Sequence, residues 1–202
     1  MALAAVLSAM TPDHLLALAE TRDLPPLIPA IISECGRYRY RLERDGPGEG
    51  RTVVIMVNPS TADATQDDAT IRKLKGFGAR NRWGRIIVGN LFAYRATDVR
   101  ELATADDPVG PLNDDELRRM MMRSDRLIFA WGPVNKVPKR LRERWRTVLQ
   151  RTPHWLVPHC IGEPAMCGHP KHPLMLPYDS PIVPWSPPAS ASVNSQGKKE
   201  IG

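Results

Sequence analysis

The chain has 202 residues, of which 42% are hydrophobic and 25% charged, the balance of one globular domain with short extensions. No apolar run approaches the ~20 residues that span a bilayer, and the three cysteines are too few for a disulfide framework. A membrane protein and a disulfide-stapled secreted protein are therefore excluded, and we expect a soluble, cytoplasmic protein. The net charge of +6 favours a polyanionic partner, because basic side chains that neutralise phosphates release counterions.

Local signals divide the chain into three segments. Residues 1–36 are expected to form a helical extension that prolines interrupt, and we treat it as part of the mature protein. Residues 37–185 are expected to form one α/β domain. The Pro- and Ser-rich tail, 186–202, has nothing to bury, so we expect it to be disordered.

Strands and helices alternate within the domain. The alternating pattern at 37–44 predicts a half-exposed strand, residues 45–50 predict a turn, and the apolar run 53–57 predicts a strand covered on both faces. Further strands are predicted over 86–88, 127–131 and 154–157, and helices over 68–82, 113–123 and 137–150. This order predicts a three-layer α/β/α fold with a central, mostly parallel four-stranded sheet, to which the hairpin before residue 53 adds an antiparallel edge strand.

Polar and aromatic side chains follow each predicted parallel strand. Ligands of open α/β sheets bind outside the carboxyl ends of the strands. Asparagine amides can read the edge of a base, histidine can donate to a carbonyl oxygen, and aromatic rings can stack. The residues at these positions are Asn58 and Ser60, then Asn90 and Phe92, then Trp131, then His169 and His172. The sequence therefore predicts a base-binding pocket at this edge of the sheet.

These four segments resemble the ordered motifs of the uracil-DNA glycosylase superfamily, over roughly residues 52–178. Val57-Asn58-Pro59 is similar to the first motif of the mismatch-specific branch, in which the Asn positions the attacking water. Asn90 resembles the Asn that binds the flipped base, and Trp131-Gly132 resembles the third motif. His169-Pro170-Lys171-His172-Pro173 resembles the His-Pro motif, whose His donates to the base oxygen.

Residues 38–185 resemble another family more closely, an uncharacterised one from bacteria and phages that is defined by the motif Asn-Pro-Ser-Thr-Ala-Asp, here residues 58–63. The two resemblances together imply a uracil-DNA glycosylase-like domain in a bacterial cell or a phage-infected host. They also imply a monomer that acts on single- or double-stranded DNA with no cofactor.

The expected activity is cleavage of the N-glycosidic bond of a uracil-like or modified pyrimidine. The residues expected in catalysis are Asn58, Asp63, Asp68, His169 and His172. Those expected to bind the base are Asn90, Trp131, Ser60 and Phe92. Those expected to contact DNA are Arg72, Arg95, Lys171 and Lys139. Asp67 belongs to the same acidic group as Asp63 and Asp68, any of which could act as a general base or a metal ligand.

Each pattern also has a structural interpretation. Residues 58–61 are all turn formers, Asp67 or Asp68 can cap a helix, Trp131 can belong to the core, and a basic face on 137–150 can simply be solvated. Cys160, Cys167, His169 and His172 match none of the usual zinc spacings, so no metal is expected.

Three other functions stay open. A transferase that modifies a pyrimidine in phage DNA fits the phage relatives and the differences from the excision motifs: Met56 replaces a glycine, and Ser60 and Thr61 stand where an aromatic residue is usual. A non-catalytic DNA- or nucleotide-binding module would not need Asn58 or the aspartates. An enzyme of free nucleosides would act without salt-sensitive DNA binding.

Overall fold

The structure, a computed structural model, describes residues 27–60 and 62–188. Its centre is a seven-stranded mixed sheet with the order β1-β2-β4-β3-β5-β6-β7. The strands are β1 (Ala30–Ile32), β2 (Arg39–Asp45), β3 (Glu49–Met56), β4 (Trp83–Asn90), β5 (Arg126–Phe129), β6 (Pro158–Ile161) and β7 (Ile182–Pro184). The strands β4, β3, β5 and β6 are mutually parallel, so the predicted α/β class with a parallel centre is confirmed.

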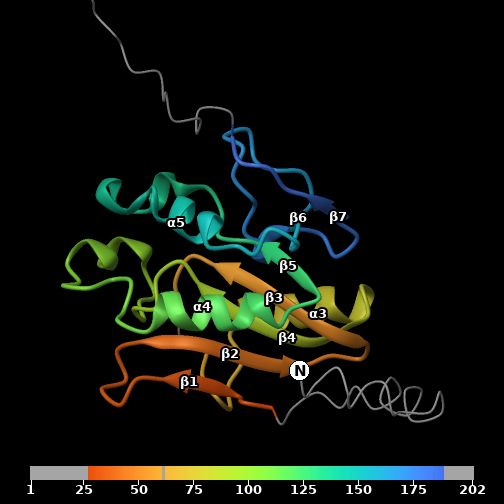
Figure 1. Cartoon of the computed structure of the whole chain (residues 1–202), viewed down its shortest axis with the longest axis horizontal. Helices are drawn as coiled ribbons and strands as arrows, with labels where there is room; N and C mark the ends of the chain where they lie inside the picture. The colour runs from red at the N-terminus through yellow and green to blue at the C-terminus, as the bar shows by residue number, and fades with distance from the viewer. Residues whose placement is uncertain (1–26, 61, 189–202) are drawn as a thin grey trace, which may run out of the picture.

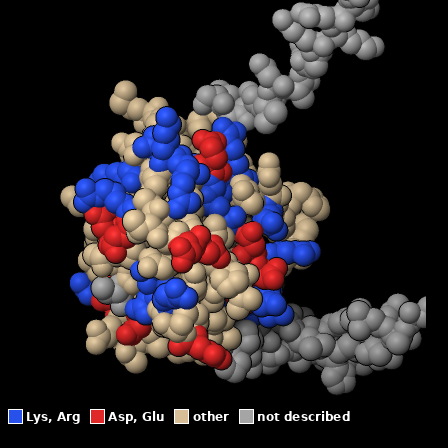
Figure 2. Space-filling model, turned by 90° about the vertical axis from the view of Figure 1, so that its left-hand side faces the viewer, with Lys and Arg blue, Asp and Glu red and all other residues tan. Residues whose placement is uncertain are grey.

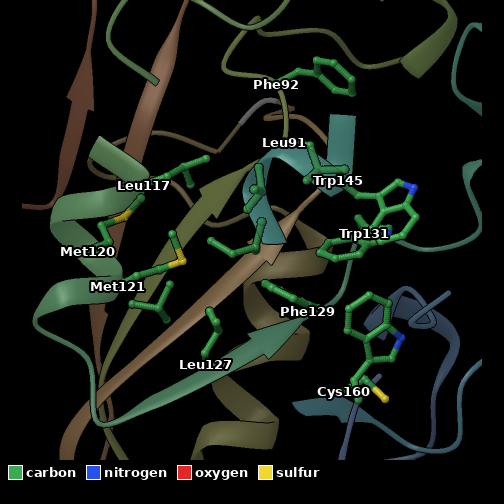
Figure 3. Close-up of a cluster of buried hydrophobic side chains, with 14 of the residues drawn as sticks. Leu91, Phe92, Leu117, Met120, Met121, Leu127, Phe129, Trp131, Trp145 and Cys160 are labelled. Carbon is green, nitrogen blue, oxygen red and sulfur yellow. The ribbon is translucent and has the colours of Figure 1, made fainter. Parts of the chain in front are cut away.

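In the described part of the chain, three α-helices cover the sheet: α3 (Ala69–Arg80), α4 (Asn113–Met122) and α5 (Arg144–Gln150). Alternate residues of β3 face opposite sides. Val53 and Ile55 belong to a core cluster that contains residues of α4 and α5, and this cluster fills the region drawn in Figure 3. Val54 and Met56 belong to a second cluster, with the apolar face of α3. The continuous apolar run of β3 is therefore explained by burial on both faces, as predicted.

The predicted hairpin before residue 53 is wrong. β2 and β3 are consecutive in the chain but do not pair, because β4 lies between them, antiparallel to β2 and parallel to β3. The short connection crosses the start of β4, where Gly46 N–H donates to the carbonyl oxygen of Gly84 at 2.6 Å. A Cβ on Gly46 or Gly48 would overlap backbone atoms at the start of β4. The glycines at 46 and 48, which predicted a hairpin turn, instead allow the β2–β3 connection to pass close to the backbone at the start of β4.

Other boundaries also differ from the prediction. The fourth parallel strand lies at 158–161 rather than 154–157, because residues 153–156 form a turn in which Leu156 N–H donates to Pro153 O at 2.9 Å. The predicted helix 137–150 is helical in the α sense only from Arg144, after 3-10 turns at Val134–Lys136 and Lys139–Leu141. β1 and β7, three residues each, were not predicted, and β1 lies within the segment expected to be a helical extension.

Two further expectations concern the ends of the chain. The expected helix before residue 27 and the expected disordered tail beyond residue 188 lie outside the described residues. Within the described ranges, no helix is long and apolar enough to cross a membrane.

Candidate functional site

A cavity of about 540 Å³ opens at the carboxyl ends of β3 and β4, next to the first turn of α3. We call it the strand-end cavity. Met56 and Asn90 are register partners, so the two strands end level with one another, and the polar residues that follow them meet. Its size falls in the range of small-molecule sites. Its polar lining residues are Arg39, Asn58, Ser60, Asp68, Thr70, Asn90, Thr97, Asp98 and His172.

Asn58 follows β3 and is held by the backbone opposite. Its Nδ2 donates to the carbonyl oxygen of Ala96 at 2.6 Å and to that of Pro59 at 3.2 Å. Because both partners are acceptors, the orientation of the amide is fixed. The side-chain oxygen of Asn58 is therefore available to accept a hydrogen bond from a ligand or a water.

Asn90 ends β4 and is 1% exposed, yet neither Oδ1 nor Nδ2 has a hydrogen-bond partner. Within the described ranges it is the one side chain with two such atoms. Asn113, also buried, is satisfied on one side: its Nδ2 donates to the carbonyl oxygens of Asn90 and Leu91, at 3.1 and 3.2 Å, while its Oδ1 has no partner. Leaving a buried amide unpaired costs about 1–3 kcal/mol, so Asn90 is a group that a ligand would satisfy.

One of the three neighbouring aspartates lines the cavity. Asp68 caps α3, where its Oδ1 accepts from Ile71 N–H at 2.8 Å. Asp63 turns away and accepts from the N–H groups of Thr65 and Gln66, which hold the pKa of its carboxyl below the usual value. Asp67 pairs with Arg44 and Lys75. Of these three aspartates, Asp68 is therefore the one at the cavity, whose lining also includes Asp98.

His172 lines the same cavity and has a defined tautomer. Its Nδ1 accepts from Leu174 N–H at 3.3 Å, so the neutral ring carries its hydrogen on Nε2. Burial lowers the pKa of His172. The backbone of Gly132 has φ +79° and passes so close that a Cβ there would lie 3.2 Å from the Cβ of His172. The sequence Trp131-Gly132 therefore lets the histidine loop approach the end of β5.

His169 lies in a different place. It is 7% exposed and its Nδ1 faces Trp131 Nε1 at 3.5 Å. It lines a separate cavity of about 300 Å³ with Glu143, Arg146 and Cys167. The two histidines that the sequence placed in one site thus belong to two cavities.

The predicted aromatic residues lie in the core. Trp131 packs on Phe129 and Trp185, with ring centroids 4.5 and 5.5 Å apart, and Phe92 is fully buried; Figure 3 shows Phe92, Phe129 and Trp131 among the side chains of this cluster. Of the residues predicted to bind the base, Asn90 and Ser60 line the strand-end cavity and the two aromatics do not.

The residues predicted to contact DNA do not line the cavity either. Arg72 Nη1 donates to Asp67 O at 2.5 Å and Arg95 Nη1 to Gly36 O at 3.2 Å, so both guanidinium groups support nearby loops. Lys171 is half-buried and Lys139 exposed.

Arg39 lines the cavity and was missed by the sequence analysis. It is 3% exposed, its Nη1 donates to Ala62 O at 2.6 Å, and its Nε has no partner. Burial lowers the pKa of Arg39 to about 10, so it stays charged at neutral pH. Regular alternation along the predicted strand 37–44 puts Arg39 on the same face as Arg41, so the sequence alone does not distinguish Arg39 as a site residue.

The described residues contain no group of three His, Cys, Asp or Glu side chains placed to hold a metal ion. Cys160 is buried in the core and donates to Gly162 O at 3.3 Å, and Cys167 is exposed.

The fold and the site define an α/β protein with a polar cavity at the carboxyl ends of its parallel strands. Residues 39–174 match a family described as a protein of unknown function, DUF1643, and the chain belongs to this family. The match spans the elements that build the cavity, from β2 to the turn after His172. No curated protein and no solved structure matches the chain. Membership of the uracil-DNA glycosylase superfamily stays a prediction.

Proposed function

We propose that the strand-end cavity binds a nucleobase and that the protein is a DNA base-processing enzyme, with glycosylase-type cleavage of the bond between sugar and base. The observation that carries this proposal is the Asn90 side chain, whose amide is buried without a partner in the cavity wall. A side-chain amide offers one acceptor and two donors. This set is complementary to the Watson–Crick edge of a pyrimidine, which presents a donor beside an acceptor.

The neighbouring groups suit the departure of a base. When the bond from C1′ to the base nitrogen breaks, its electron pair leaves with the base, and negative charge spreads to the base oxygens. The Nε2–H of His172 supplies a donor for that charge, and a fixed donor stabilises charge that develops in the transition state.

The incoming oxygen needs a position and a proton acceptor. Asn58, whose amide is fixed by Ala96, can orient a water through its side-chain oxygen. Asp68 lines the same cavity and its carboxylate can accept the proton as the water oxygen bonds to C1′. An amide cannot accept a proton at neutral pH, so the roles of Asn58 and Asp68 are distinct.

The order of the motifs supports a uracil-DNA glycosylase-like assignment. Asn58, Asn90, Trp131 and the histidine pair follow successive parallel strands β3, β4, β5 and β6 in chain order, as the superfamily motifs do. Trp131 keeps its position in this order but is a core residue, because it packs on Trp185 and its Nε1 faces His169 of the histidine loop.

The charge distribution supports a nucleic acid substrate. β3 points toward the left of Figure 1, so Figure 2 looks onto the end of the sheet that holds the cavity. Lys and Arg side chains gather over the upper part of this face, at the level of α5 and the turns before it, with some acidic surface among them, and the lower part carries both signs of charge. The exposed residues of those turns include Lys136, Lys139 and Arg140. Phosphates would follow this basic edge.

A second candidate is a transferase that modifies a base without releasing it. It is favoured by the cavity itself, which has about 540 Å³ and no Phe, Tyr or Trp in its lining, and so offers room for a group attached to the base. In that reaction the nitrogen of an amine co-substrate would bond to the methylene carbon of phosphorylated hydroxymethyluracil, phosphate would leave with the electron pair of the broken C–O bond, and Asp68 would take the proton from the amine.

Mass spectrometry of nucleosides and free bases separates these functions. The protein is incubated with oligonucleotides that contain uracil, hydroxymethyluracil or phosphorylated hydroxymethyluracil, with and without amine co-substrates, beside Asn58→Ala and Asn90→Leu variants. Free base and an abasic strand, lost in both variants, are expected. An intact strand of higher mass would establish the transferase instead, and unchanged strands that still bind would leave a binding module.

A further inference from the structure

We propose that the strand-end cavity contains a phosphate subsite, formed by Arg39 and the first turn of α3, so that its ligand is a nucleotide rather than a free base or a nucleoside. This inference rests on the proposed function, since the base half of the ligand is the one assigned to Asn90.

A β-bulge turns Arg39 into the cavity. On β1, the neighbours Ile31 and Ile32 are register partners of Arg41 and Arg39, so Tyr40 is an extra residue on β2. Beyond the bulge the strand alternates regularly, with Leu42 packed in the α3 cluster and Arg44 bonded to the loop before α3. Without the bulge Arg39 would face the opposite side, with Arg41. Bulges next to functional sites re-aim side chains in this way.

The guanidinium of Arg39 is a buried charge without a carboxylate that neutralises it directly. One of its nitrogens bonds to a carbonyl oxygen, Ala62 O, and its Nε is unpaired. Arg85, the other buried arginine of the described residues, is paired: its Nη1 lies 3.3 Å from Glu43 Oε2 and its Nε lies 2.7 Å from Asp45 Oδ1. A buried cation needs a counter-charge, and the planar donors of arginine match the oxygens of a phosphate.

The start of α3 adds donors on the same wall. Asp68, Ala69 and Thr70 all line the cavity. The first N–H groups of a helix have no acceptor within the helix and favour an anion. Asp68 accepts that of Ile71, which leaves the N–H groups of Ala69 and Thr70 at the cavity.

Two carboxylates line this cavity, and each already has partners. Asp68 accepts from the helix, and Asp98 accepts from the backbone N–H and the side chain of Arg100, which lower the pKa of Asp98 to about 2. Arg39 Nε has none. An anion that enters the cavity therefore gains its new ionic partner at Arg39.

Titration calorimetry at low salt tests the subsite. The probes are the common 2′-deoxynucleosides and deoxyuridine, their 5′- and 3′-monophosphates, a short single-stranded oligonucleotide, and inorganic phosphate. We expect a monophosphate to bind about tenfold or more tightly than its nucleoside. A preference for a free 5′- or 3′-monophosphate over the oligonucleotide would identify a mononucleotide ligand, and the reverse would identify a phosphate within a strand.

The variant Arg39→Gln should abolish the preference for phosphate and leave the affinity for the nucleoside within about threefold. Arg44→Gln is the matched control, because Arg44 projects from the same strand to the same loop, at Asp63 O and Asp67, but does not line the cavity. It should keep the preference. An equal loss of nucleoside and nucleotide affinity in Arg39→Gln would show that Arg39 only supports the loop, and would overturn the subsite.

Competition with the unaltered protein gives a result that does not depend on folding of a variant. Inorganic phosphate should weaken binding of the monophosphate and leave binding of the nucleoside unchanged. Equal affinity for nucleosides and monophosphates would overturn the phosphate subsite and leave the base site standing. Phosphate binding that depends on Arg39, without binding of any nucleoside, would instead refute the proposed function while the subsite remains.

Discussion

Replacing Asn90 by leucine should make the protein more stable and unable to bind its ligand. The side chain is 1% exposed and both its polar atoms lack partners. Each unpaired buried group costs about 1–3 kcal/mol, and an apolar group of similar shape removes that cost. Asn90→Leu should therefore raise the free energy of unfolding by at least about 1 kcal/mol. For a chain of this size that raises the melting temperature by about 2–4 °C per kcal/mol.

Asn113→Leu is the matched control. Asn113 is also fully buried, but its Nδ2 holds the carbonyl oxygens of Asn90 and Leu91. Its loss should lower the free energy of unfolding by about 1–2 kcal/mol. Chemical and thermal unfolding measure both variants, and calorimetry with deoxynucleosides measures binding. If Asn90→Leu destabilises the protein as much as Asn113→Leu does, Asn90 maintains the fold and the reasoning from its unpaired amide fails.

Three further predictions concern catalysis, pH and the strand crossing. Asp68→Asn should keep the cap of α3, because asparagine caps a helix as well as aspartate does, but should reduce the rate of product formation at least about a hundredfold. Asp67→Asn is the control, because the Asp67 carboxylate lies off the cavity, and it should keep the rate. Mass spectrometry of the products compares the two variants. Burial lowers the pKa of His172 below its ordinary 6.5, so as the pH falls the unfolded chain takes up the proton before the folded one does, and the free energy of unfolding decreases as the pH drops through 6.5. Urea unfolding at several pH values should show a shallower decrease for His172→Gln. An identical decrease in the variant would contradict the assignment. Gly48→Ala should lower the free energy of unfolding by about 3 kcal/mol or more, because the new Cβ would overlap a backbone oxygen. Gly36→Ala, where φ is +70° and the space around the Cβ is open, should lower it by about 1–2 kcal/mol. Equal losses in unfolding experiments would refute the crossing.

The parallel centre of the fold could be predicted because burial on both faces leaves a clear pattern. The run at 53–57 has no polar residue, and the helices between strands carry one apolar face each. The insertion of β4 beside β2 could not be predicted, since glycines at 46 and 48 fit a hairpin turn as well as a crossing. The edge strands β1 and β7 are too short, at three residues each, to give a periodic signal.

The site was predictable where it depends on strand ends and not where it depends on loop conformation. Asn58 and Asn90 follow apolar strands directly, so the topology brings them together. His169 and His172 have the same flanking prolines, and only the folded loop separates them into two cavities. Of the three nearby aspartates, Asp68 lines the cavity because it caps the start of α3, and the sequence alone did not distinguish it from Asp63 and Asp67. Arg39 was missed because a single extra residue in β2 reverses the face that an alternating pattern assigns to it.

Two ligand-facing side chains of the cavity, Asn90 and Arg39, each have a nearby residue of the same type that bonds to the backbone around them. Asn113 binds the carbonyl oxygen of Asn90 itself, and so fixes the end of β4 from which the unpaired amide projects. Arg44 binds the loop that follows β3, against which Arg39 also lies. In each pair the structural member uses donor groups to hold the backbone, whereas Asn90 has no hydrogen bond on either side-chain polar atom and Arg39 Nε has none. Such an arrangement holds donors and acceptors in place before the ligand arrives, so binding need not bear the entropy cost of ordering them. It also predicts that ligand binding raises the free energy of unfolding with little change in structure, because the desolvation cost of Asn90 and Arg39 is already present in the empty protein.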